Sequence, residues 1–211
     1  MRKVYPLLLL LVAVVFSAAV YGELPEQMPV HWNLRGEVDR YGGPLEGVLL
    51  MPLMAIAIWG FMRVLPKIDP RKANFERFRD TYEFVINGVM TILLVMHVVL
   101  LCAAMGWPIP TNRVVPALFG VMLIGIGNVF PRSRSNWLFG VRTPWTLSSD
   151  RVWARTHRVA GYLFVVAGLA FLLYAALPGP LTIGIALAVT ATAIVGSVLY
   201  SYVAWRKERT S

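Results

Sequence analysis

Long, uninterrupted apolar runs constrain the fold of this chain more than any other feature of its sequence. Of its 211 residues, 57% are hydrophobic and 15% are charged, and the mean hydropathy is +0.63. Within the runs, apolar residues do not alternate with polar ones at the period of a half-buried helix or strand, which is typical of segments surrounded by lipid. Because lipid offers no partner to backbone N–H and C=O groups, each run is predicted to be an α-helix.

Six runs are long enough, or nearly so, to cross a hydrocarbon core, which needs about 20 apolar residues. The sequence therefore predicts an all-α, polytopic membrane protein with six transmembrane helices. The first run could instead be a secretory signal, because Arg2 and Lys3 precede it and small residues close it, but its apolar length favours a retained helix. The runs extend from Val4 to Tyr21, Leu45 to Leu65, Tyr82 to Gly106, Val114 to Phe130, Arg158 to Leu177 and Leu181 to Trp205.

The positions of Lys and Arg predict the orientation of these helices. All but three of the 20 basic residues lie at the two ends of the chain or in the second-to-third and fourth-to-fifth connections; the exceptions are Arg35, Arg40 and Arg113. Cytoplasmic flanks collect Lys and Arg, so both termini are predicted to be cytoplasmic. The net charge of +9 is then a consequence of topology and of contact with anionic lipid in the bilayer. We expect no direct nucleic-acid partner.

The connection between the first two helices is predicted to face outward. Its centre, "MPVHWNLRGEVDRYGG", is predicted to form a short extended pair around a glycine turn. One functional hypothesis is a small polar site for a peptide or a cation, although one His with scattered carboxylates is a weak metal signature. The alternative, favoured from spacing alone, is that these side chains satisfy loop backbone and anchor the interface. The candidate residues are His31, Trp32, Asn33, Glu37 and Asp39.

The connection before the fifth helix is unusually patterned for a chain this apolar. In "RTPWT", Pro144 predicts an extended approach, and Arg142 could stack on Trp145 or bind backbone carbonyls and carboxylates. A lipid-facing loop with aromatic anchors is the alternative. Ser148 or Ser149 followed by Asp150 predicts a helix start outside the bilayer.

The helix that begins there is predicted to be two-faced. Arg151 and Arg155 fall on one side, whereas Trp153 and His157 fall on the other, where they can pack on the bundle. Small residues further along predict close helix packing in lipid, because packing rather than hydrophobicity drives association there. These are Ala160, Gly161, Ala167 and Gly168 in the fifth helix and Gly184, Ala188, Thr192 and Gly196 in the sixth.

Two stretches carry a resemblance to a known family. "GN" at positions 127–128, "NWLFGVRTPWTLSSDRVWARTHRVAG" at 136–161 and "PVHWNLRGEVDRYG" at 29–42 resemble the signatures of the SdpI family of bacterial membrane immunity proteins and of the small domain of unknown function that usually precedes it. The matching positions of the inner motif are Asn128, Asn136, Gly140, Arg142, Thr143, Pro144, Trp145, Thr146, Trp153, Arg155, Thr156 and His157.

The resemblance implies a multi-pass protein of the bacterial cytoplasmic (inner) membrane that protects the cell against a toxic peptide secreted by its own kin. The best-studied member of the family also holds a cytosolic repressor at the membrane, and the resemblance suggests the same role as an expectation for this chain. The expected division is residues 1–65, with the first two spans and the outer loop, and residues 66–211, with the four-span part and the inner motif, in one integrated membrane domain.

Polar groups inside the spans are functional candidates because they are costly in lipid. His97, Asn87 and Glu83 all lie in the third span. A neutral His97 that is hydrogen-bonded to a neighbouring helix is favoured over a proton relay. Glu83 is expected to pair with Arg63 or Arg79.

The resemblance makes an immunity protein the leading hypothesis. We expect it to be non-enzymatic and without cofactor or metal, because no catalytic constellation emerges. One alternative is a small transporter or channel in which His97, Asn87 and Asn128 line a path. Another is a scaffold whose basic inner loops, with Arg151 and Arg155, recruit a soluble regulator.

Overall fold

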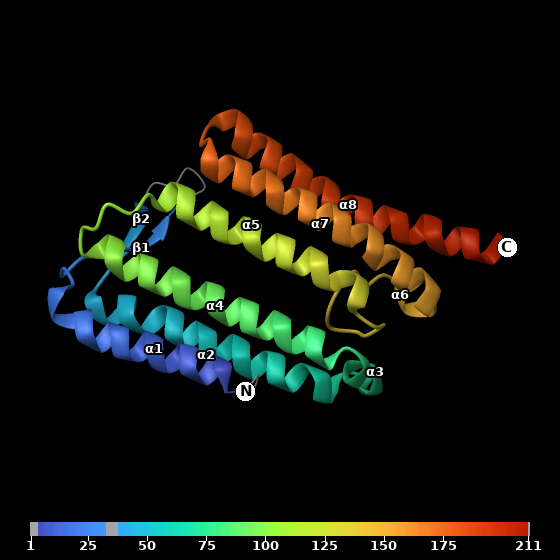
Figure 1. The fold of residues 1–211 in the computed structure, drawn as a ribbon, viewed down its shortest axis with the longest axis horizontal. Coiled ribbons are helices and arrows are strands. Elements are labelled where there is room, and N and C mark those ends of the chain that lie inside the picture. The colour runs from blue at the N-terminus through green and yellow to red at the C-terminus, as the bar shows by residue number, and fades with distance from the viewer. Residues whose placement is uncertain (1–3, 33–37, 211) are drawn as a thin grey trace. The chain divides into compact units, whose positions relative to one another are not determined.

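The structure, a computed structural model, describes residues 4–32 and 38–210. Within them, six helices are long and apolar enough to span a membrane, which confirms the predicted all-α, polytopic membrane fold (Figure 1). The elements are α1 (Tyr5–Val20), η1 (Tyr21–Glu23), β1 (Met28–Trp32), β2 (Val38–Gly42), α2 (Pro44–Ile68), α3 (Lys72–Arg77), α4 (Arg79–Ala104), α5 (Thr111–Val129), η2 (Phe130–Arg132), α6 (Pro144–Ser148), α7 (Asp150–Ala176) and α8 (Pro180–Thr210).

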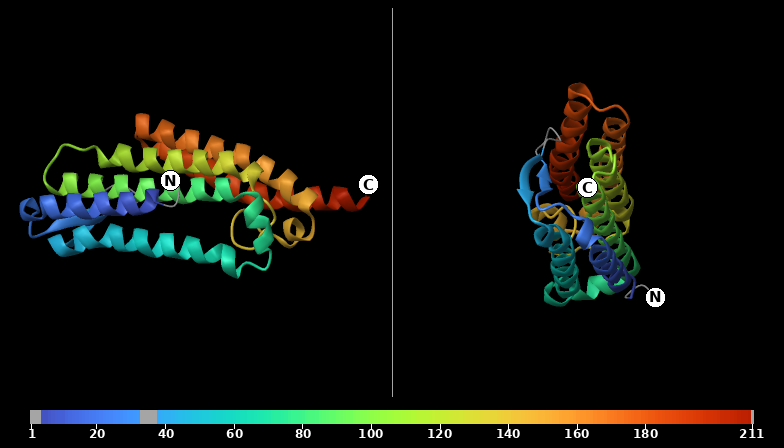
Figure 2. Two further views of the ribbon diagram at one scale, coloured as in Figure 1. Left: turned by 60° about the horizontal axis from the view of Figure 1, so that its bottom comes forward. Right: turned by 90° about the vertical axis from the view of Figure 1, so that its left-hand side faces the viewer.

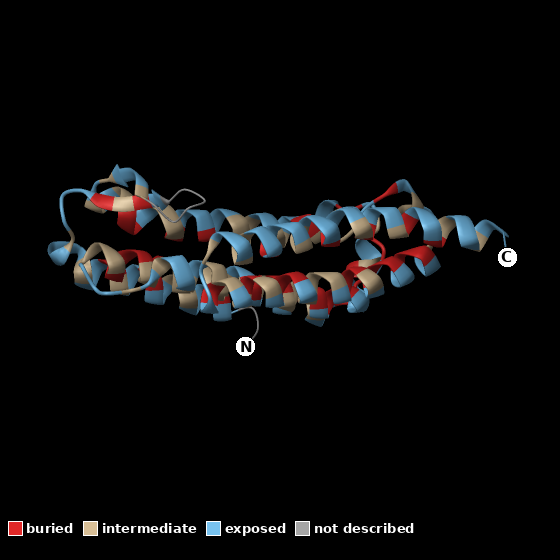
Figure 3. Ribbon diagram, turned by 90° about the horizontal axis from the view of Figure 1, so that it is seen from above, coloured by how far each residue is buried: buried red, intermediate tan, exposed pale blue. Residues whose placement is uncertain are grey.

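The chain divides into two compact units, which we describe separately. The first comprises Met1–Met62 and Ile86–Val115, and the second comprises Arg63–Val85 and Pro116–Ser211. Along the helices of both units, buried residues form stripes that are interrupted by exposed ones (Figure 3). The exposed positions are largely Leu, Val, Ile and Phe, as expected for helices whose outer surface meets lipid.

The first unit contains the predicted extended pair. β1 and β2 are antiparallel, with Met28 opposite Gly42 and Trp32 opposite Val38, and the register shifts on both sides of His31. The inward side chains Met28 and Val30 join a buried cluster with Val48 of α2 and with Leu100 and Leu101 of α4. The hairpin is therefore fixed to the helices by one apolar face.

In the second unit, α5 and α7 approach each other at glycines. A Cβ added to Gly127 would lie 2.6 Å from the carbonyl oxygen of Gly161, and one added to Gly168 would lie 2.5 Å from that of Gly120. Real Cβ atoms do not come so close to a backbone oxygen, so only glycine fits at this crossing. The small face predicted for the fifth helix is thus used, in part against α5.

Helices α7 and α8 form an antiparallel hairpin, and the two views of Figure 2 show them side by side. Ala167 and Phe171 of α7 pack with Ala186 and Ala193 of α8. The face predicted for the sixth helix was wrong: Ala188 and Thr192 are exposed, and a Cβ on Gly184 would meet nothing within 4 Å. The buried face comprises Ala186, Ala193, Ser197, Ser201 and Ala204.

Candidate functional site

The motif segment, residues 133–157, connects η2 to the first turns of α7. It contains a short helix, α6, that the sequence did not reveal. Thr143 is the N-cap of α6: its backbone is extended, Pro144 occupies the first turn, and the Thr143 and Thr146 side chains each accept from the other's backbone N–H. This reciprocal capping box satisfies two N–H groups that a helix start leaves open. Thr143 is therefore extended before Pro144, as predicted.

His157 is the centre of the motif segment. Its Nε2 accepts from the backbone N–H of Val141 at 3.0 Å, and its Nδ1 lies 2.9 Å from the carbonyl oxygen of Trp153. Because a backbone N–H can only donate, Nε2 must be unprotonated and Nδ1 must carry the hydrogen. His157 is thus a fully buried, neutral imidazole with both nitrogens satisfied.

Aromatic rings and one glycine enclose the His157 imidazole. Trp153 stacks on it with a centroid distance of 3.9 Å, and Phe130 meets it edge-on at 5.5 Å. On another side, Gly140 has a φ of 106°, and a Cβ there would overlap the imidazole Nε2. Gly140 is therefore needed both for its backbone conformation and for the space that the imidazole occupies.

Asn136 shapes the start of the motif segment. Its Oδ1 accepts from the N–H groups of Leu138 at 2.9 Å and Phe139 at 2.6 Å, and its Nδ2 donates to the carbonyl oxygen of Arg134 at 2.8 Å. An amide that is fully buried, as Asn136 is, must be satisfied in this way. It replaces the backbone pairing that this turn lacks.

Asp69, which sequence reasoning missed, holds the motif segment from the end of α2. Its Oδ2 accepts from the N–H of Trp137 at 2.8 Å, and its Oδ1 accepts from the N–H of Arg71 at 2.6 Å. Asp69 is one of only 11 acidic residues in the chain, and it directly follows a span on the basic side. An acid placed directly after a span, in a mainly basic connection, was the available signal.

Two residues near the start of α3 complete this attachment, and they were also missed. The Arg71 guanidinium donates to the Ser135 hydroxyl and, at 2.6 Å, to the carbonyl oxygen of Leu147. Asn74 Nδ2 donates to the carbonyl oxygen of Ser135 at 2.6 Å. The basic connection between the second and third helices is therefore a structural partner of the motif segment.

One side of the motif segment remains exposed. Arg142 donates to the carbonyl oxygen of Trp137 at 2.9 Å. Binding to a backbone carbonyl was one of the two roles predicted for this side chain. Trp145 packs on Tyr202 of α8, with a centroid distance of 5.0 Å. The Trp137 side chain is 48% exposed. A groove of about 530 Å³ opens here, lined by Trp137, Arg142, Thr143, Pro144, Leu147 and Ser148.

The remaining predicted motif residues play different parts. Ser149 is the N-cap of α7 and accepts from the N–H of Val152, which confirms the predicted helix start. Arg155 is exposed, whereas Thr156 is fully buried. Asn128 is exposed and donates to the carbonyl oxygen of Ile124 in its own helix at 2.9 Å, so it takes no part in the network around His157.

The candidate residues of the hairpin are more loosely held. His31 Nδ1 lies 2.6 Å from Asp39 Oδ1, with 63% and 42% of the two side chains exposed. Trp32 is the last residue of β1, and Asn33 and Glu37 lie outside the described residues. Among residues 4–32 and 38–210, the structure contains no group of three or more His, Cys, Asp or Glu side chains that could hold a metal ion.

Two of the predicted polar contacts within the spans are present. Glu83 pairs with Arg63 at 2.5 Å, while Arg79 pairs with Glu76 at 3.3 Å. His97 Nε2 lies 2.7 Å from the hydroxyl of Ser17 in α1, which confirms the expected bond to a neighbouring helix. Asn87 lies on the same helix, and its backbone carbonyl accepts from the hydroxyl of Thr91.

Comparisons with known proteins agree with these two motif-bearing regions. The family model described as the SdpI/YfhL protein family matches residues 132–201, and that of a domain of unknown function, DUF1648, matches residues 8–56. The chain is 23% identical to "Immunity protein SdpI" of Bacillus subtilis (strain 168) over 206 residues, which are 98% of this chain and 97% of that protein.

A second relative is the "Uncharacterized membrane protein YbgB" of Bacillus subtilis (strain 168). It is 30% identical over 94 residues, which cover 44% of this chain and 82% of that protein. No solved structure matches the chain. The family matches contain the hairpin and the whole motif segment, and they confirm the resemblance drawn from the sequence: this multi-pass membrane protein belongs to the SdpI/YfhL family.

Proposed function

We propose that this protein confers immunity to a secreted toxic peptide. The observation that carries the proposal is the alignment with a protein named for immunity over 98% of this chain and 97% of that protein. An end-to-end match includes the hairpin, the motif segment and all six candidate spans, so it is not confined to one shared helix pair. The protective role is proposed to be non-enzymatic and to need no cofactor.

We further propose that both termini and the motif segment are on the cytoplasmic side, and that the hairpin is outside. The distribution of Lys and Arg supports this orientation. Reporter fusions at the hairpin, at the 106–110 connection and at the C-terminus test it. Activity of a periplasm-specific reporter at the first two positions alone is the expected result, and activity at the C-terminus would contradict it.

The peptide is proposed to meet the hairpin. The His31–Asp39 pair is exposed, and the connection that contains it carries more acidic than basic residues. Such a surface favours a cationic or amphipathic peptide. The buried apolar face of β1 would hold the exposed His31–Asp39 pair in a fixed position when the peptide binds.

A cytosolic regulator is proposed to bind the groove beside Trp137 and Arg142. An exposed Trp next to a guanidinium is typical of residues that dominate interfaces. Photo-cross-linking from Leu147 in living cells tests this part. A cross-linked soluble protein that is lost with Arg142→Ala is expected, and a yield unchanged by that substitution would contradict it.

The immunity proposal is tested by survival of a sensitive bacterium that expresses the protein and is exposed to a panel of secreted antimicrobial peptides. The wild type is expected to protect against at least one peptide. His31→Ala is expected to abolish that protection at equal membrane abundance, while Glu23→Ala, another charge change in the same connection, retains it. Protection by His31→Ala equal to the wild type would remove the hairpin from the peptide site.

The transporter alternative gains no support from two of the residues it invokes. Asn128 donates to its own helix, and His97 Nε2 is bonded to Ser17. A flux through proteoliposomes that depends on His97 would be needed to favour it.

A further inference from the structure

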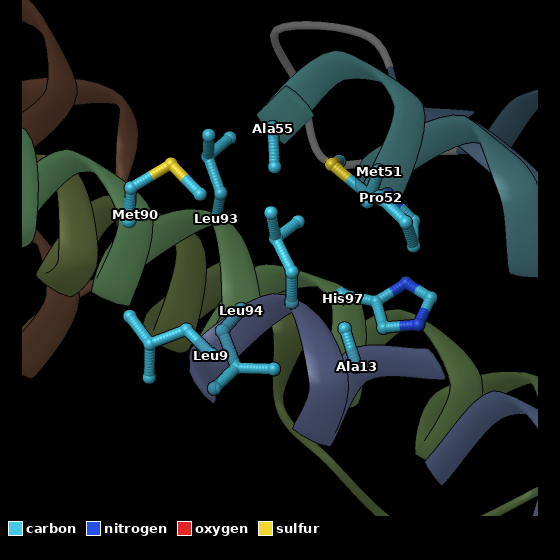
Figure 4. Close-up of a pocket in the computed structure, with 10 residues that line it drawn as sticks. Leu9, Ala13, Met51, Pro52, Ala55, Met90, Leu93, Leu94 and His97 are labelled. Atoms are coloured by element: carbon cyan, nitrogen blue, oxygen red, sulfur yellow. The ribbon is translucent and has the colours of Figure 1, made fainter. Parts of the chain in front are cut away.

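The cavity between α1, α2 and α4 in the first unit offers little to a polar ligand (Figure 4). Its volume is about 10 Å³, and among the described residues that line it only His97 has a polar side chain. The Nε2 of His97 is already bonded to Ser17 at 2.7 Å, and an apolar cavity of this kind stays dry. A polar ligand requires a larger and more polar hollow, and the second unit contains one.

The cleft in the second unit lies between α3, the first residues of the motif segment and the start of α7. Its volume is about 540 Å³, within the range of roughly 300–1,000 Å³ that is typical of small-molecule sites. It is distinct from the groove beside Trp137, because the two share no lining residue. Its lining includes Asn74, Arg77, Ser133, Arg134, Ser135 and Asp150.

The uncharged part of this lining is fixed by hydrogen bonds. Asn74 Nδ2 donates to the carbonyl oxygen of Ser135 at 2.6 Å. The Ser133 hydroxyl donates to the carbonyl oxygen of Phe130 at 2.7 Å and accepts from the indole N–H of Trp153 at 3.2 Å. Because Ser133 and Ser135 are also buried, this side of the cleft is preorganised, and a ligand does not have to order it.

Three charged side chains line the same cleft without being paired. Within residues 4–32 and 38–210, the side chains of Arg77, Arg134 and Asp150 take part in no hydrogen bond or ion pair. The nearby Arg71 guanidinium, in contrast, is already bonded to the motif segment. Opposite charges that line one cleft but do not pair with each other leave room for a ligand that carries both signs.

All three charged residues lie at the ends of candidate spans. Arg77 is two residues before the span of α4, Arg134 is two residues after the span that ends with η2, and Asp150 is the first residue of the span of α7. Two residues extend at most about 7 Å, which is comparable to the headgroup layer of about 5–8 Å on each side of the hydrocarbon core. Basic pockets between spans at this level are typical sites for lipid headgroups.

We propose that this cleft binds the headgroup of one phosphatidylethanolamine molecule. The phosphodiester accepts hydrogen bonds from Arg77 and Arg134, because the planar donors of a guanidinium match phosphate oxygens. The ammonium group of the same headgroup donates to the Asp150 carboxylate. Phosphatidylcholine has the phosphate but no N–H donor, and phosphatidylglycerol has the phosphate but no cation. The cleft therefore selects its lipid by both ends of the headgroup.

Native mass spectrometry of the full chain, titrated with these three lipids carrying identical acyl chains, tests the site. One phosphatidylethanolamine is expected to bind about tenfold more tightly than either other lipid, as the loss of one charge-assisted bond implies. Binding of phosphatidylcholine or phosphatidylglycerol that is equal or tighter would overturn the proposal. Inorganic phosphate in large excess is not expected to displace the lipid, and displacement would assign the cleft to free phosphate instead of a headgroup.

Two variants test the two ends of the headgroup. Arg134→Ala is expected to weaken phosphatidylethanolamine binding by about tenfold, whereas Arg132→Ala, the same charge change two residues away and outside the lining, is not. Asp150→Asn keeps the size of the side chain but removes its charge, so the preference over phosphatidylcholine is expected to disappear. An equal loss in the two arginine variants, or an unchanged preference in Asp150→Asn, would overturn the proposal.

Discussion

The motif segment and the hairpin are similarly rich in polar and aromatic residues, yet their structures differ. In the motif segment, Asn136, Thr146 and His157 are fully buried and bonded to backbone groups. In the hairpin, the polar pair His31–Asp39 is exposed and only the alternate apolar residues are buried. A dense polar motif can therefore be mostly internal framework. In the motif segment, only the side with Trp137 and Arg142 is available to a partner.

The strongest test of this difference is to remove the two central histidines in turn. His157→Ala removes two hydrogen bonds and a stacked ring from a buried position, so we expect a loss of about 3–4 kcal/mol in the free energy of unfolding. His31→Ala removes an exposed pair that contributes less than about 1 kcal/mol. Unfolding titrations in mixed micelles measure both. Equal losses would mean that the motif segment is no better packed than the hairpin.

The support beneath the motif segment can be broken at the α5–α7 crossing. Gly127→Ala places a Cβ against the backbone of α7, and overpacking of this kind costs about 1–3 kcal/mol. Gly125→Ala is the matched control in the same helix, because a Cβ there meets nothing within 4 Å, and it is expected to be neutral or slightly stabilising. The same unfolding titration applies. A Gly127→Ala variant as stable as Gly125→Ala would contradict the close crossing.

A smaller effect is expected at the attachment of the motif segment to the end of α2. Asp69→Asn keeps the size of the side chain but replaces one acceptor oxygen by an NH₂ group, so one of its two backbone bonds is lost. We expect the free energy of unfolding to fall by about 1–3 kcal/mol. Hydrogen exchange at the Trp137 amide should become faster. Asp39→Asn in the exposed hairpin pair should cost less than about 1 kcal/mol. Unchanged exchange at Trp137 would show that Asp69 does not hold this turn.

The smallest effect on stability is expected on the exposed side of the motif segment. Arg142→Ala loses one solvent-exposed bond to a carbonyl, so the free energy of unfolding should change by no more than about 0.5 kcal/mol. A thermal unfolding scan measures it beside Arg158→Ala, which lies on the exposed face of α7. A large loss for Arg142 alone would assign it to the framework instead.

Sequence reasoning found the elements whose signals are local. The six helices follow from apolar length, the start of α7 from Ser149 and Asp150, and the hairpin from alternation around a glycine turn. Local signals do not reveal which distant segment satisfies a turn. Asp69 and Trp137 are 68 positions apart, so the attachment of the motif segment to α2 required the structure.

The packed face of α8 was mispredicted for a related reason. Small residues occupy more than one side of this helix, and the row Gly184, Ala188, Thr192 and Gly196 was chosen for its regular spacing alone. Which small face is buried depends on the side chains that α7 presents, among them Ala167 and Phe171. Hydrophobicity does not distinguish the buried face of α8 from its lipid-facing side, because both faces are apolar.

The most direct test of the account is survival of a sensitive bacterium that carries the wild type, Arg142→Ala or Arg158→Ala and is challenged with secreted antimicrobial peptides at equal membrane abundance. We predict that the wild type and Arg158→Ala protect, and that Arg142→Ala does not, although all three fold. Protection by Arg142→Ala equal to the wild type would contradict a functional role for the exposed side of the motif segment. Absence of protection by the wild type against every peptide would contradict the immunity function itself.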